Sequence, residues 1–201
     1  MSKTLDYFLV PQSPWAYLGH ARLAEIAARR GAAVVVRPMD LGRIFPLSGG
    51  LPLGKRAPQR QSYRLVELAR WSTFLGMPLN VHPKFFPVAG DDAARWIVAA
   101  RAAGGDAAAM RMAGGLLAAV WAQERDIADP ATLAAIAREQ GLDAAALAAG
   151  ALAPAAQEEY DRNTQAATDA QVFGAPWYVY RGEPFWGQDR LEFLDRALGA
   201  N

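Results

Sequence analysis

The sequence predicts an α/β protein in which a large helical block separates two short parts that contain β-strands. Short runs rich in β-branched and aromatic residues lie near both ends of the chain. The segment between them is rich in alanine and has helical patterns with no convincing strand from about residue 43 to 169. The predicted order is therefore β-α-β, a helical block, and β-β-α.

The first part has the pattern of a βαβ unit. Residues 4–10 predict a largely buried strand bounded by Pro11, and residues 33–37 predict a second strand ended by Pro38. Between them we expect a helix from Ser13 to about Arg30, because Gly31 is a helix stop. Its apolar face would hold Trp15, Gly19, Leu23, Ile26 and Ala27. Two strands and a helix this close in sequence favour a right-handed crossover.

Glycine and proline divide the middle segment into predicted helices. Asp129-Pro130 supplies an N-cap and a first-turn proline for one of them, and Gly141 ends it. The other helices are expected at 59–75, 92–103, 107–123, 142–151 and 155–170.

The last part returns to β-structure. Residues 177–180 predict a strand, Arg181-Gly182 a tight turn, and Phe185-Trp186 a partner strand. A final helix is expected at 188–198, because Gly199 would end it.

Composition narrows the function classes. The 201 residues suit one domain, or one domain with a sizeable insertion, and the net charge of +1 gives no basic surface for nucleic acid. The absence of cysteine excludes disulfides, thiolate metal sites and cysteine nucleophiles. The two histidines have no partner ligands in the sequence, so no metal site is expected. The first residues lack a signal peptide's apolar run, and residues 112–122 are too few to cross a bilayer, so we expect a soluble cytoplasmic protein.

Ser13-Pro14 lies where the first strand turns into the first helix. Serine and proline are common at helix N-termini, so the pair can be a simple cap. The positive end of a helix also stabilises a nearby anion, a thiolate included. Ser13 can therefore serve as a helix cap, as a group that helps to stabilise an anion, or as both.

A resemblance to a known family favours the chemical role of Ser13. In thioredoxin-like redox proteins the first helix begins with Cys-x-x-Cys, whereas residues 13–16 here are Ser-Pro-Trp-Ala, so dithiol exchange is impossible. The chain resembles the kappa-class glutathione transferases and 2-hydroxychromene-2-carboxylate isomerases, and the isomerases more closely. The matching motifs are Tyr7-Phe8, Ser13-Pro14, Leu68-Ala69-Arg70-Trp71, Gly76-Met77-Pro78, Asn163, Phe173-Gly174-Ala175-Pro176 and Phe185-Trp186-Gly187-Gln188-Asp189-Arg190-Leu191.

The resemblance implies a thioredoxin-like, DsbA-like fold with an inserted all-α domain. Residues 1–42 and 171–201 would form the thioredoxin-like domain, and residues 43–170 the insertion. A homodimer is also implied.

The resemblance further implies glutathione as the cofactor. Ser13 would donate a hydrogen bond to the glutathione sulfur and favour its thiolate. Ala175, before a cis Pro176, would pair its backbone with the cysteinyl unit. Trp186, Gly187, Gln188 and Asp189 would bind the γ-glutamyl group, with Asp189 on its ammonium. For Pro176 the alternative is a trans Ala175–Pro176 peptide bond at the start of a strand. For residues 188–189 it is the ordinary first turn of a helix, with no ligand.

The substrate contacts are expected at Lys55, Arg56 and Phe86. A cation at 55–56 would hold a substrate carboxylate, and Phe86, with Phe85, would supply an aromatic wall. Alternatively, Lys55 and Arg56 are a solvated pair in a loop, and Phe85 and Phe86 pack in the core. The chain departs from the family pattern at Phe45, where a lysine can occur, and at Gly50, where the family often has asparagine.

The implied activity is the glutathione-dependent conversion of 2-hydroxychromene-2-carboxylate, or a related aromatic, to trans-o-hydroxybenzylidenepyruvate in aromatic hydrocarbon degradation. The thiolate would add to the conjugated ring, the opened chain would rotate, and glutathione would leave again. Two alternatives stay open: a kappa-type glutathione transferase or peroxidase, and a non-catalytic module that binds a hydrophobic ligand.

Overall fold

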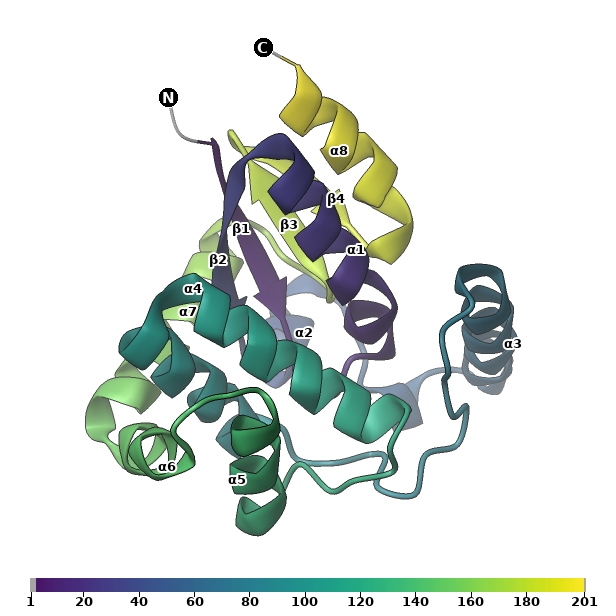
Figure 1. Ribbon diagram of the computed structural model, residues 1–201. Helices are drawn as coiled ribbons and strands as arrows, with labels where there is room; N and C mark the ends of the chain where they lie inside the picture. The colour runs from purple at the N-terminus through teal and green to yellow at the C-terminus, as the bar shows by residue number, and fades with distance from the viewer. Residues whose placement is uncertain (1–2, 201) are drawn as a thin grey trace.

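The structure is a computed structural model that describes residues 3–200, and residues 1, 2 and 201 of the predicted thioredoxin-like domain lie outside this range. Figure 1 shows its elements in space. In chain order they are β1 (Lys3–Leu9), α1 (Pro14–Arg30), β2 (Ala32–Pro38), α2 (Leu41–Ser48), η1 (Leu53–Lys55), α3 (Pro58–Leu75), α4 (Asp91–Trp121), α5 (Pro130–Glu139), α6 (Ala144–Leu152), α7 (Pro154–Asp169), β3 (Trp177–Tyr180), β4 (Glu183–Trp186), η2 (Gln188–Arg190) and α8 (Leu191–Gly199).

The four strands form one mixed sheet in the order β2-β1-β3-β4. β1 pairs in parallel with β2, as a βαβ unit requires, and antiparallel with β3, which pairs antiparallel with β4. The predicted order of elements is confirmed, with the helical block inserted between β2 and β3.

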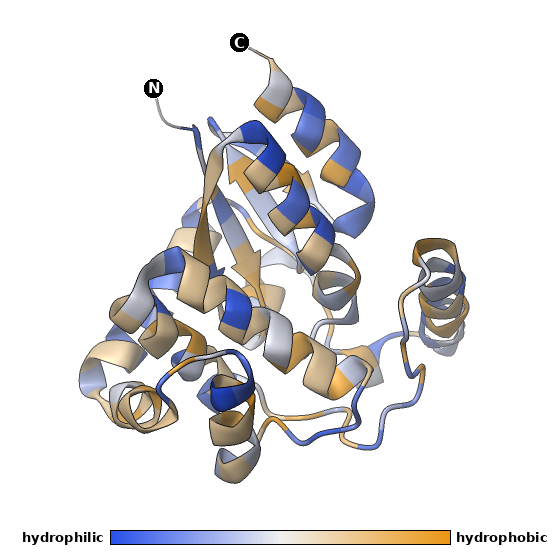
Figure 2. Cartoon of the chain, viewed as in Figure 1, coloured by the Kyte–Doolittle hydropathy of each residue, from blue (hydrophilic) through white to orange (hydrophobic). Residues whose placement is uncertain are grey.

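Side chains alternate between the two faces of β1. Leu5, Tyr7 and Leu9 join the larger core, which α1, α4 and α8 cover, whereas Phe8 joins a smaller core beneath α2 and α7. In Figure 2 the strands carry both orange or tan hydrophobic segments and bluer ones, and blue hydrophilic segments recur along α1 and α8. The sheet is thus buried between two helical layers.

Two backbone features place the first helix. Ser13 is the N-cap of α1, and Gly31 ends it with a φ of 62°, a left-handed conformation that glycine adopts without strain. A Cβ at Gly19 would come within 2.8 Å of the Cβ of Gln188, so glycine lets α1 approach η2 closely. The beginning of α1 and the end of β4 are therefore neighbours.

The long helix α4 is two helices that meet at a kink. Gly104 and Gly105 have non-helical dihedral angles, with a φ of 70° at Gly105. The break falls where the sequence predicts one helix to end and the next to begin. Gly115 lies inside the second half, where a Cβ would come 2.7 Å from Ile136 of α5, so its absence permits close packing of these helices.

Two elements, α2 and η1, were not predicted from the sequence. Pro46 and the following Gly49-Gly50 favour a loop, yet residues 41–48 are helical. The Asp40 side chain caps α2 by accepting from the N–H groups of Gly42 and Arg43, and Ile44 is buried beneath the sheet. Within residues 3–200 no helix is long and apolar enough to span a membrane.

Candidate active site

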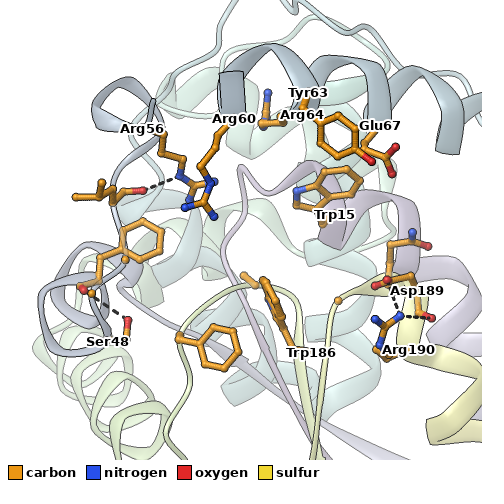
Figure 3. A pocket seen from close by; sticks show the side chains of 18 of the residues that line it. Trp15, Ser48, Arg56, Arg60, Tyr63, Arg64, Glu67, Trp186, Asp189 and Arg190 are labelled. Atoms are coloured by element: carbon orange, nitrogen blue, oxygen red, sulfur yellow. Dashed lines mark hydrogen bonds and ion pairs between the residues drawn. The ribbon is translucent and has the colours of Figure 1, made fainter. Parts of the chain in front are cut away.

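A cavity of about 700 Å³ opens between α3 and the ends of the strands. This volume lies within the range of small-molecule sites. Five parts of the chain line it: the start of α1, the α2–η1 segment, α3, the loop before β3, and the β4–η2 junction (Figure 3). The lining residues are Trp15, Phe45, Ser48, Gly49, Gly50, Leu51, Arg56, Gln59, Arg60, Tyr63, Arg64, Glu67, Trp71, Phe173, Ala175, Trp186, Gly187, Gln188, Asp189 and Arg190.

Ser13 lies at the edge of this cavity, behind its lining. It is 6% exposed, and its neighbours Trp15 and Ala175 form the wall. The Ser13 Oγ accepts a hydrogen bond from the Ala16 N–H at 3.1 Å and donates one to the Ala175 carbonyl at 3.4 Å. Ser13 therefore caps α1. Its hydrogen bond to the Ala175 carbonyl is long, so the hydroxyl can instead donate to a better acceptor.

The histidine of the same helix does not serve Ser13 as a base. His20 Nε2 lies 3.0 Å from the Met110 carbonyl, so Nε2 carries the hydrogen and Nδ1 accepts from the Tyr7 hydroxyl at 3.3 Å. Burial lowers the His20 pKa to about 4, while the bond to Met110 opposes this shift. A neutral ring with both nitrogens engaged leaves Ser13 as a hydrogen-bond donor, not an activated nucleophile.

The two downstream motifs meet at the floor of the cavity. Phe173 and Trp186 stack edge to face with ring centroids 4.7 Å apart. A Cβ at Gly174 would come 2.5 Å from Trp186 Nε1, so only glycine fits beneath the indole. The Gly187 N–H donates to the Pro176 carbonyl at 2.9 Å, and the Ala175–Pro176 peptide bond is cis.

Gln188 and Asp189 lie in different environments. Gln188 is 2% exposed, and its side-chain oxygen accepts from Arg22 of α1 at 2.9 Å, which ties η2 to the first helix. Asp189 lies at the cavity surface and pairs with Arg190 at 2.7 Å. No side chain caps η2, and the Arg190 N–H donates to the Gly187 carbonyl at 3.2 Å.

Three arginines form the opposite wall: Arg56 directly follows η1, and Arg60 and Arg64 lie on α3. Arg56 donates to the Leu51 carbonyl at 2.8 Å, and its guanidinium lies over the Phe45 ring at 5.8 Å. Burial lowers the Arg56 pKa, and Arg60 adds to this shift. Burial, followed by repulsion from Arg56, lowers the pKa of Arg64 to about 10. Within residues 3–200 none of the three is ion-paired (Figure 3).

The predicted substrate residues are separated in space. Arg56 lines the cavity, whereas Lys55 and Phe86 lie outside the lining. Lys55 is exposed at the end of η1. Phe86 packs against the indole of Trp121 with ring centroids 4.8 Å apart, which places it in a layer behind Arg64.

The residue Asn163 of the family pattern serves a junction between elements. It is 1% exposed on α7 and accepts a hydrogen bond from Arg37 of β2 at 3.3 Å. It lies outside the cavity lining.

Four further residues of the cavity were not predicted from the sequence: Arg60, Tyr63, Arg64 and Glu67. These residues share one face of α3 with Trp71, at spacings of three and four residues, and all of them line the cavity. That spacing is visible in the sequence. It could have indicated a polar helix face turned toward a ligand, because α3 buries only Leu68 completely.

The fold and the site together define a DsbA-like thioredoxin-fold protein whose first helix starts with serine where redox members have cysteine. Residues 4–199 match the family described as a DSBA-like thioredoxin domain. The chain is 31% identical over 199 residues to a 2-hydroxychromene-2-carboxylate isomerase of Sphingobium xenophagum, covering 98% of this chain and 99% of that protein. A protein of the same name from Pseudomonas putida is 31% identical over 197 residues, which cover 97% of this chain and 94% of the Pseudomonas protein.

A solved structure gives the same result in three dimensions. A 2-hydroxychromene-2-carboxylate isomerase structure superposes with a TM-score of 0.80 at 27% identity, covering 98% of this chain and 94% of that chain. The chain therefore belongs to the DSBA-like thioredoxin domain family and, within it, to the family of 2-hydroxychromene-2-carboxylate isomerases.

Proposed function

We propose that this protein is a glutathione-dependent isomerase of 2-hydroxychromene-2-carboxylate or a closely related aromatic carboxylate. The observation that carries the proposal is the position of the Ser13 hydroxyl. It lies at the N-terminus of α1, 3.4 Å from the carbonyl of Ala175, at the edge of a cavity that both aromatic and cationic side chains line. Membership in the isomerase family supplies the reaction class.

The residues around Ala175 fit glutathione. The Ala175 N–H has no acceptor within residues 3–200, and Ala175 borders the cavity. An extended peptide could use this backbone as a short antiparallel partner. Asp189 offers a carboxylate at the same side of the cavity, although it shares its charge with Arg190. An exposed pair of this kind is worth at most about 1 kcal/mol, so an ammonium group can compete for Asp189.

Glutathione, when bound, supplies a thiol nucleophile that can add reversibly to a conjugated system. The protein's part is to hold that sulfur as an anion. The Ser13 Oγ–H can turn from the Ala175 carbonyl toward a stronger, charged acceptor. The N-terminal dipole of α1 favours the same charge state. Both nitrogens of the neutral His20 ring are engaged by Tyr7 and Met110, so we assign it no role as a base.

The aromatic side chains define the place for the second substrate. Trp15 projects into the cavity from α1 and Tyr63 faces it from α3 (Figure 3). Trp71 of α3 also belongs to the cavity lining. Flat walls of this kind hold an aromatic ring and keep water away from the reacting atoms.

The experiment is to follow the interconversion of 2-hydroxychromene-2-carboxylate and trans-o-hydroxybenzylidenepyruvate with and without glutathione. We expect acceleration that requires glutathione and leaves its concentration unchanged. Net consumption of glutathione would instead indicate a transferase. No acceleration by the purified protein would contradict the proposal.

A further inference from the structure

The cavity wall on η1 and α3 carries an arrangement of like charges that the fold does not need. Arg56, Arg60 and Arg64 follow one another at intervals of four residues and all line the cavity. Arg60 and Arg64 lie one turn apart on α3, and like charges at this spacing on a helix repel and reduce its stability, whereas Arg56 precedes the helix. They are also partly desolvated, which lowers the pKa values of Arg56 and Arg64. Both costs would fall if an anion bound between them.

Arg64 is the most confined of the three. Its guanidinium lies 5.2 Å from the Phe86 ring centroid and 5.5 Å from that of Trp121, so two aromatic rings fix its position. Within residues 3–200 it makes neither a hydrogen bond nor an ion pair. A guanidinium carries five N–H donors in a planar fork that matches a carboxylate. Arg64 is therefore a positioned cation whose donors are free.

The acidic side chains of the cavity do not neutralise this wall. Glu67, one turn from Arg64, pairs with Arg70, and Asp189 pairs with Arg190. In Figure 3, Arg56 and Arg60 lie at the opposite end of the cavity from the Asp189–Arg190 pair. The cavity is therefore polarised, with its excess positive charge on the side of α3.

We propose that Arg64, assisted by Arg60, binds the carboxylate of the aromatic substrate, so that α3 selects anionic aromatics over neutral ones. This inference rests on the proposed function for the identity of the site, but it assigns the anion contact to α3 and not to the Lys55-Arg56 pair. The ring of such a ligand would lie toward Trp15 and Trp71, which border the same space. The glycyl carboxylate of glutathione has the same chemistry and must be distinguished from it.

The test compares the binding of trans-cinnamate with that of its neutral analogue trans-cinnamamide, by calorimetry at neutral pH, in wild type, Arg64→Gln and Arg60→Gln. The control is Arg196→Gln, because Arg196 also lies over an aromatic ring, that of Phe193 at 6.0 Å, but outside the cavity lining. Glutathione binding is measured separately for every variant, and thermal melting verifies that each one is folded.

We expect wild type and Arg196→Gln to prefer cinnamate over cinnamamide by about tenfold or more, the value of a charge-assisted hydrogen bond. Arg64→Gln should lose most of this preference and Arg60→Gln part of it, with glutathione affinity little changed in both. Equal affinities in wild type, or a preference that survives in both cavity variants, would overturn the inference. So would a loss of glutathione affinity without a loss of the cinnamate preference, because the wall would then bind the cofactor.

The same experiment separates this inference from the proposed function. If the preference depends on Arg64 but glutathione neither binds nor supports isomerisation, the anion site stands and the isomerase proposal fails. If isomerisation requires glutathione but no preference exists, the isomerase proposal stands and the anion site fails.

Discussion

Replacing Ser13 by alanine removes two interactions that differ in kind. One is the cap bond from the Ala16 N–H, at 3.1 Å, and the other is the donor that faces Ala175. Ala16 is fully buried, so its N–H would lose its side-chain acceptor without gaining water. We expect a loss of about 1–2 kcal/mol of unfolding free energy from the cap alone.

The control for this stability loss is Asp143→Ala. Asp143 caps α6 by accepting from Ala145 and Ala146 at 3.0 and 3.1 Å, and α6 contributes nothing to the cavity. Both variants should melt at a temperature lower by a few degrees, because about 1 kcal/mol lowers the melting temperature of a chain this long by roughly 2–4 °C. Only Ser13→Ala should lose activity.

The catalytic part of the effect is measured on the cofactor itself. A charge-assisted hydrogen bond to the thiolate is worth about 1.5–3 kcal/mol, so its loss should raise the thiol pKa of bound glutathione by about 1–2 units. Thiolate absorbance as a function of pH reports this pKa, and kcat should fall by about ten- to a hundredfold at neutral pH. An unchanged thiol pKa in a variant that still binds glutathione would refute the role of Ser13. Equal loss of activity in Asp143→Ala would trace it to stability.

Two further substitutions test the surroundings of the site. Because the folded-state pKa of His20 is lowered from 6.5 to about 4, the unfolded chain binds the extra proton between these values, and stability falls as pH decreases through that window. Denaturant titrations at pH 7 and 5 should show wild type losing about 1–2 kcal/mol that His20→Gln does not lose, whereas His82→Gln, a change at an exposed histidine, should behave like wild type. Gly174→Ala would place a Cβ 2.5 Å from Trp186 Nε1, so we expect about 1–3 kcal/mol of destabilisation and weaker glutathione binding by calorimetry. Gly54→Ala, which meets only open space, is its control, and equal behaviour of the two glycine variants would count against the close fit.

The order of elements could be predicted because local signals and packing agree in most of the chain. The strand at β1 is short, apolar and bounded by Pro11, and the helix after it has both a cap at Ser13 and a stop at Gly31. Gly104-Gly105 likewise marked the kink of α4. α2 was missed because Pro46 opposes a helix locally, while burial of Ile44, a tertiary effect, favours it.

The candidate site was predictable only where its residues belong to compact motifs. The meeting of the segments around Gly174 and Trp186 follows from the order of the strands, so the floor of the cavity could be expected. The polar face of α3 was visible in the spacing of its residues. That this face lines the cavity could not be predicted, because the orientation of the helix depends on long-range contacts. The sequence placed the cation at Lys55 and Arg56, but the turn at η1 leaves Lys55 exposed while Arg60 and Arg64, farther along the chain, face the cavity.

The division of the cavity between two parts of the fold has a consequence for specificity. The floor at Ala175 and Gly187 consists of backbone held by the sheet, where a change of side chain disturbs packing. α3 buries only Leu68 completely, so most of its cavity-facing side chains carry no core packing. Substitutions at Arg60 or Tyr63 can therefore change the charge and shape of the wall at little cost in stability. If the cofactor binds at the floor, the side chains of α3 therefore determine which second substrate binds, because the core constrains few of them.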